Sequence, residues 1–134
     1  YEKDPNDIVK ARELYLTDLN SFYKKEEGED LNNIAEGIKG QKGNVSLNIG
    51  EVIYFENDSY ENAAQLITRK IKDQYFCHST NYAANIIKGK NIESNKFNED
   101  DIDQAITFLK KRLDLIPEEF HSYLIDQYSN PLYN

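Results

Sequence analysis

The sequence has no methionine and no tryptophan, and it has one cysteine, three prolines and six glycines. A single cysteine cannot form an internal disulfide framework, so the fold must depend on a packed core. The sequence contains no run of 18 apolar residues, which excludes a transmembrane helix. Basic residues are not in excess, which argues against a general nucleic-acid binder, because such proteins neutralise phosphates with Lys and Arg.

Acidic and amide residues are abundant instead. The 134 residues include 24 Asp and Glu against 16 Lys and Arg, which gives a net charge of −8, together with 15 Asn and 10 Tyr. This length suits one domain, and such a domain buries about two thirds of its unfolded surface. The start at Tyr1 and the absence of methionine indicate a processed or excised piece. We therefore expect one acidic domain over residues 1–134.

Capping residues followed by apolar residues at spacings of three and four predict a mainly α fold of six or seven helices. The expected helices begin after Asp4, Asp30, Asp58, Ser79 or Thr80, Asn98, and at Pro117, and the first continues to Gly28. Segment 44–56 is open: its helical neighbours favour a helix, whereas its β-branched residues favour a short β-hairpin. Loop 90–98 is expected to attach to the core through Ile92 and Phe97.

Residues 44–117 contain small residues at expected helix crossings and a proline at a helix end, at the positions Ile49-Gly50, Tyr60, Ala63, Ile67, Ala105, Leu109 and Pro117. This set of positions resembles the tetratricopeptide family of helical-hairpin repeats. Ser46 stands where the family has an aromatic residue, and Ala63 and Ala105 are 42 residues apart, longer than the family's repeat. The resemblance implies a concave peptide-binding scaffold.

The run Phe76-Cys77-His78-Ser79-Thr80, with the apolar stretch after it, resembles the opening of mono-ADP-ribosyltransferase-like toxins. That resemblance implies that His78 and Thr80 grip the nicotinamide ribose of NAD. Those toxins are mostly β, whereas the residues after Thr80 have a helical pattern. The residues themselves favour Ser79 or Thr80 as a helix cap.

Other chemistry is weakly supported. Cys77 and His78 are adjacent in sequence and His121 lies far along the chain, so no nucleophile and base are paired by spacing. Two histidines and one cysteine without ligand spacing do not indicate a metal site. The acidic run 100–103 lacks the glycine and the final glutamate of a calcium loop. We expect no catalytic residue, no metal and no cofactor.

Acidic clusters and tyrosines carry the remaining functional signal. Acids steer basic partners, and tyrosine is a favoured interface anchor. The sequence therefore favours a non-enzymatic, acidic protein-binding module, such as an inhibitor, immunity or regulatory protein, that docks on a basic protein and does not contact nucleic acid directly. The expected contact residues are Glu26, Glu27, Asp30, Glu99, Asp100, Asp101, Tyr123 and Tyr128. Tyr15, Tyr60 and Tyr75 lie on apolar stripes and are expected in the core.

Overall fold

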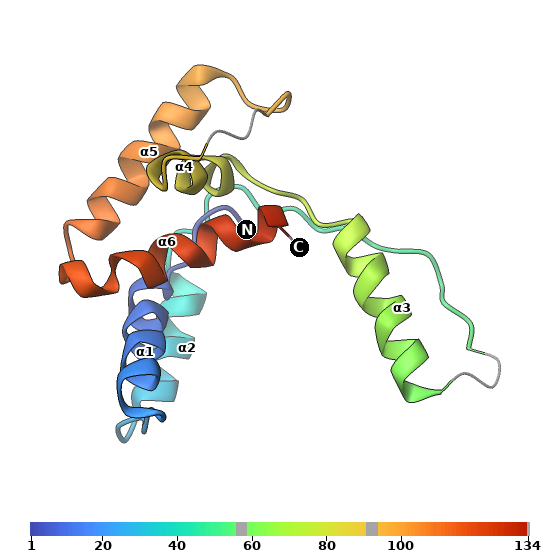
Figure 1. Cartoon of the computed structure of the whole chain (residues 1–134), viewed down its shortest axis with the longest axis horizontal. Helices are drawn as coiled ribbons and strands as arrows, with labels where there is room; N and C mark the ends of the chain where they lie inside the picture. The colour runs from blue at the N-terminus through green and yellow to red at the C-terminus, as the bar shows by residue number, and fades with distance from the viewer. Residues whose placement is uncertain (56–58, 91–93, 134) are drawn as a thin grey trace.

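Every regular element in residues 1–55, 59–90 and 94–133, which the computed structural model describes, is helical (Figure 1). The α-helices are α1 (Asp7–Asn20), α2 (Glu29–Lys39), α3 (Tyr60–Asp73), α4 (Ser79–Ile87), α5 (Glu99–Leu113) and α6 (His121–Ser129). Two 3₁₀ turns, η1 (Glu118–Phe120) and η2 (Asn130–Tyr133), flank α6. The prediction of a mainly α fold is confirmed. Within these ranges, no helix has both the length and the hydrophobicity needed to cross a bilayer.

Four of the helices build the core. Helix α4 packs against both α5 and α6, and α1 packs against α6. Half of the buried apolar residues are alanines, and such small side chains allow helix axes to approach closely. The buried apolar set is Ala11, Ala83, Ala84, Ala105, Leu109, Leu124, Ile125 and Tyr128.

Helix α2 lies beside the start of α1 and has no buried residue. A Cβ atom built on Gly40 would overlap the ring of Pro5, so glycine is required for this close approach. The Asn6 side chain also donates a hydrogen bond to the Asn33 carbonyl oxygen at 2.9 Å. Helix α2 therefore contacts the rest of the molecule through Gly40 and the Asn33 carbonyl group. Its apolar stripe, formed by Leu31, Ile34 and Ile38, is exposed.

Helix α3 stands apart from the four-helix core, and none of its residues is buried (Figure 1). A helix was predicted to begin after residue 58, and α3 begins at Tyr60; the Ser59 hydroxyl caps it by accepting a hydrogen bond from the Asn62 amide at 3.2 Å. The predicted cap Asp58 lies outside the described residues. Tyr60, expected in the core, is 94% exposed, because no other element covers its stripe. Tyr75, which follows the helix and was also expected in the core, is 56% exposed.

The first helix is shorter than predicted. It ends at Asn20, and Ser21 adopts a left-handed conformation with φ 63° instead of continuing to Gly28. Leu19, near the end of the helix, and Phe22, just beyond it, are both exposed, so neither side chain anchors a longer helix to the core. The helix also begins later than predicted, at Asp7, and Asn6 is its N-cap residue. Asp4 instead stabilises the turn before the helix, because its carboxylate accepts a hydrogen bond from the Asn6 amide at 2.8 Å.

Segment 44–55 forms neither the helix nor the hairpin considered for it, and residue 56 lies outside the described residues. Val45, Leu47 and Ile49 are exposed, so the segment lacks the apolar contacts that would select one conformation. Lys70 of α3 forms an ion pair with Glu51 of the segment at 3.6 Å. Ile49 and Gly50, which carried part of the tetratricopeptide resemblance, belong to this irregular stretch.

Leu109 provides a direct test of the core. Its side chain is completely buried, so L109A is expected to lower the free energy of unfolding by about 2–5 kcal/mol through lost burial and the remaining cavity. Urea unfolding measures the change. The matched control L115A truncates an exposed leucine and should change stability by less than about 0.5 kcal/mol. Equal effects of the two substitutions would contradict this core.

Candidate functional site

A surface hollow of about 650 Å³ lies between α4 and α5. Tyr82 and Ile86 line it from α4, and Ile102 and Ile106 line it from α5. These pairs are four residues apart, so each occupies one face of its helix. A volume of this size falls within the usual range for ligand sites in proteins.

Loop 94–98 also lines the hollow, and Phe97 attaches this loop to two other aromatic side chains. Its ring lies 5.9 Å from the Tyr82 ring and 6.4 Å from the Phe76 ring, in tilted and edge-on arrangements respectively. The Lys96 ammonium lies 4.9 Å from the centre of the Phe76 ring, which is a cation–π contact. The predicted attachment through Phe97 is therefore observed, whereas Ile92 lies outside the described residues.

Acidic side chains form part of the hollow's rim. Glu99 and Asp103 line it, both are exposed, and neither forms an ion pair within the described ranges. Asp101 instead completes the helix cap: its carboxylate accepts from the Asn98 amide at 3.2 Å, and its own amide donates to the Asn98 side chain at 2.8 Å. Asp100 lines a neighbouring hollow with two lysines, Lys3 and Lys111.

The other predicted acids lie elsewhere. Glu26, Glu27 and Asp30 belong to the α1–α2 connection and the start of α2, at the opposite end of the molecule from the start of α5 (Figure 1). Asp30 is paired with Lys25 at 2.6 Å, whereas Glu26 and Glu27 are exposed. The structure therefore separates the predicted acids into two surfaces.

The two predicted contact tyrosines differ sharply. Tyr123 is partly exposed, and its hydroxyl donates a hydrogen bond to Asp18 at 2.9 Å, which raises the pKa of the phenol. Tyr128 is buried, so the expectation that it is an exposed contact is wrong. Its hydroxyl satisfies the Asp7 carboxylate at 2.8 Å, a pairing across 121 residues that has no local signal in the sequence.

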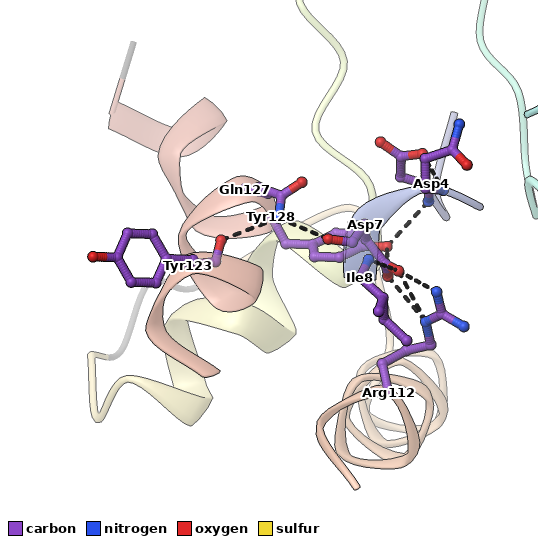
Figure 2. Close-up of polar contacts among 8 residues, drawn as sticks. Asp4, Asp7, Ile8, Arg112, Tyr123, Gln127 and Tyr128 are labelled. Carbon is purple, nitrogen blue, oxygen red and sulfur yellow. Dashed lines mark hydrogen bonds and ion pairs between the residues drawn. The ribbon is translucent and has the colours of Figure 1, made fainter. Parts of the chain in front are cut away.

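Figure 2 shows the polar cluster around Asp7, which is completely buried at the start of α1. The Arg112 guanidinium of α5 donates from Nε to both carboxylate oxygens, at 3.0 and 3.1 Å, and a second nitrogen also contacts the carboxylate. The Gln127 side chain donates to the Asp7 carbonyl oxygen at 3.0 Å. Hydrogen bonding to Asp7 raises the pKa of Arg112. This cluster joins α1, α5 and α6.

The residues of the toxin resemblance occupy the start of α4 and are largely buried. His78 is the residue before the helix, and its amide donates to the Asn81 side chain at 2.6 Å, so the cap is one residue earlier than expected. The Thr80 hydroxyl donates to the Glu2 carbonyl oxygen at 2.6 Å, and the Ser79 hydroxyl donates to the Glu2 carboxylate at 2.9 Å. His78 lines a hollow of only about 240 Å³.

Cys77 and His121 lie outside these clusters. Burial raises the pKa of the Cys77 thiol, the opposite of what a reactive thiolate requires. His121 lies with Nε2 3.1 Å from the Leu113 carbonyl oxygen, at the end of α5. Residues 1–55, 59–90 and 94–133 contain no group of three His, Cys, Asp or Glu side chains placed to hold a metal ion.

Of the residues that line the α4–α5 hollow, sequence reasoning predicted only Glu99 as a contact residue. Asp103 was not among the predicted contacts, Phe97 was expected only to attach its loop to the core, and Tyr82 had no assigned role. The sequence did contain a signal for the aromatic and aliphatic wall of the hollow. Tyr82 and Ile86, and likewise Ile102 and Ile106, are four residues apart, so each pair lies on one face of its helix. Comparison of the chain with protein-family models, curated proteins and solved structures gives no significant match.

Arg112 tests the buried cluster. Replacing it in R112M leaves the Asp7 carboxylate without its cation, and breaking such a buried pair costs about 3 kcal/mol of unfolding free energy. The double variant D7N/R112M should recover part of this loss, because no uncompensated charge remains. Chemical denaturation of both proteins measures the difference. A double variant that is no more stable than R112M would contradict a charge-based role.

Tyr128 gives a pH-dependent test. Burial, with the nearby Asp7 carboxylate, raises the folded-state pKa of Tyr128 above 10.0, so stability contributed by the protonated phenol is complete below that pH and declines as pH rises past it. At pH 7, Y128F should be less stable than wild type by about 1–2 kcal/mol, since Asp7 loses a hydrogen-bond donor. The gap should narrow between pH 10 and about pH 11. If chemical denaturation finds the same difference in unfolding free energy between wild type and Y128F at every pH, the raised pKa of Tyr128 is contradicted.

Proposed function

We propose that this chain is a non-enzymatic, acidic protein-binding module, and that the α4–α5 hollow receives a basic side chain of its protein partner. The observation that carries the proposal is that aromatic and aliphatic side chains line the hollow together with two exposed carboxylates, those of Glu99 and Asp103. Lys and Arg have the same dual character, with an apolar stem and a charged head. The stem would contact Tyr82 and Phe97, while the head would pair with Glu99 or Asp103.

Ion pairing at the start of α5 would by itself contribute little binding free energy, so the aromatic and aliphatic wall of the hollow is needed as well. The N-terminus of α5 carries about half a positive charge from the helix dipole, which offsets part of the negative charge of Glu99. Exposed ion pairs contribute only about 0–1 kcal/mol each. Cation–aromatic contact and burial of the stem add to that pairing, so the hollow supplies what an acidic helix end alone does not. The Lys96–Phe76 contact illustrates the same chemistry within the chain.

Hexa-arginine and hexa-glutamate peptides provide defined probes. Calorimetry at 50 mM NaCl should detect binding of hexa-arginine only, and binding should weaken at 300 mM NaCl because exposed charges are screened. The variant E99Q/D103N should weaken binding about tenfold. The matched variant E26Q/E27Q removes the same charge from the distant acidic surface and should weaken binding less than about twofold.

Two results would overturn the proposal. Equal weakening by E99Q/D103N and E26Q/E27Q would mean that the hollow has no special role and that net charge alone attracts the peptide. Binding that does not change with salt would remove the electrostatic basis altogether.

A further inference from the structure

Two helices turn their apolar stripes outward. On α2, Leu31, Ile34 and Ile38 are 74%, 59% and 75% exposed, and on α3, Ile67 and Ile71 are 42% and 60% exposed. The spacings of three and four place each stripe along one face of its helix. Exposed stripes of this kind mark surfaces that are covered in an assembly.

The two helices have opposite charge. Acids outnumber bases on α2, whereas α3 is the one helix in the described ranges in which bases outnumber acids. The α2 residues are Glu29, Asp30 and Glu36 with Lys39, and the α3 residues are Arg69, Lys70 and Lys72 with Glu61 and Asp73. Asp30 and Lys70 already form ion pairs within the chain, with Lys25 and Glu51 respectively. The complementary charges are therefore carried mainly by Glu36 on α2 and by Arg69 and Lys72 on α3, beside the two apolar stripes.

The chain does not pair these helices with each other. Helix α2 lies beside α1, whereas α3 stands on the far side of the molecule (Figure 1). An anionic membrane would suit the basic α3 but would repel the acidic α2. A second copy of the chain satisfies both helices at once, because it brings a basic stripe to α2 and an acidic stripe to α3.

We infer that two copies form a symmetric dimer in which α3 of each copy packs on α2 of the other. A two-fold axis makes the two α2–α3 contacts identical, and exchange of an element that is already separate from its core is a low-cost route to a dimer. This inference rests on surfaces other than the α4–α5 hollow, so it stands or falls independently of the proposed function.

Complementing variants test the exchange. I34D introduces a charge into the α2 stripe and I67D introduces one into the α3 stripe, and both positions are exposed in the single chain, so the core should be retained. Light scattering and sedimentation at about 100 µM, within the usual range for weak dimers, should find wild type dimeric and each variant alone monomeric. A mixture of the two should form a heterodimer weaker than the wild-type dimer, because one α2–α3 contact remains intact. The control L115D charges an exposed leucine outside both stripes and should remain dimeric.

Charge reversal tests complementarity with the apolar stripes left intact. K70E/K72E makes α3 acidic and should yield a monomer, whereas K110E/K111E reverses two exposed lysines on α5 and should leave the dimer unchanged. A monomeric wild type would overturn the inference. A dimeric I34D variant would also overturn it, because α3 would then contact something other than α2. Dimerisation that is unaffected by K70E/K72E would remove its electrostatic basis.

Discussion

The buried pair between Asp7 and Arg112 is the interaction on which the arrangement of the core depends. A carboxylate without solvent is costly unless its charge and its lone pairs are satisfied. Arg112 supplies the opposite charge and Tyr128 supplies a further hydrogen bond. Because these three groups come from α1, α5 and α6, satisfying one carboxylate fixes the relative positions of three helices (Figure 2).

Several polar side chains of the chain are buried, whereas many of its apolar side chains are exposed. Polar side chains such as Ser79, Thr80 and Asn81 are buried at the start of α4, where they bind the N-terminal segment and the Tyr128 carbonyl oxygen. Apolar residues on α2, α3 and segment 44–55 are exposed. A buried polar network specifies one geometry for the four-helix core. The exposed stripes leave apolar surface available for association, which suits a chain whose proposed role is to bind other proteins.

Helix positions could be predicted where the signal was local. The Asn98 cap, the acidic first turn and the basic last turn belong to one short stretch, and α5 begins where they indicate. Segment 44–56 could not be settled, because its conformation depends on contacts that its own residues do not specify. Burial of Tyr128 also escaped prediction, since its partner Asp7 has the appearance of an ordinary acid in the first turn of a helix.

The hydrogen bonds that hold the N-terminal segment have a consequence for how the chain acquires its structure. Glu2 contacts Thr80, and Asp7 contacts Arg112 and Tyr128, across separations of 78, 105 and 121 residues. Closing such long loops costs chain entropy before any contact is gained. Helical proteins usually fold quickly because most of their contacts are local. Here α1 takes its buried partners from α5 and α6, so the core cannot be completed until the chain has been synthesised through Tyr128.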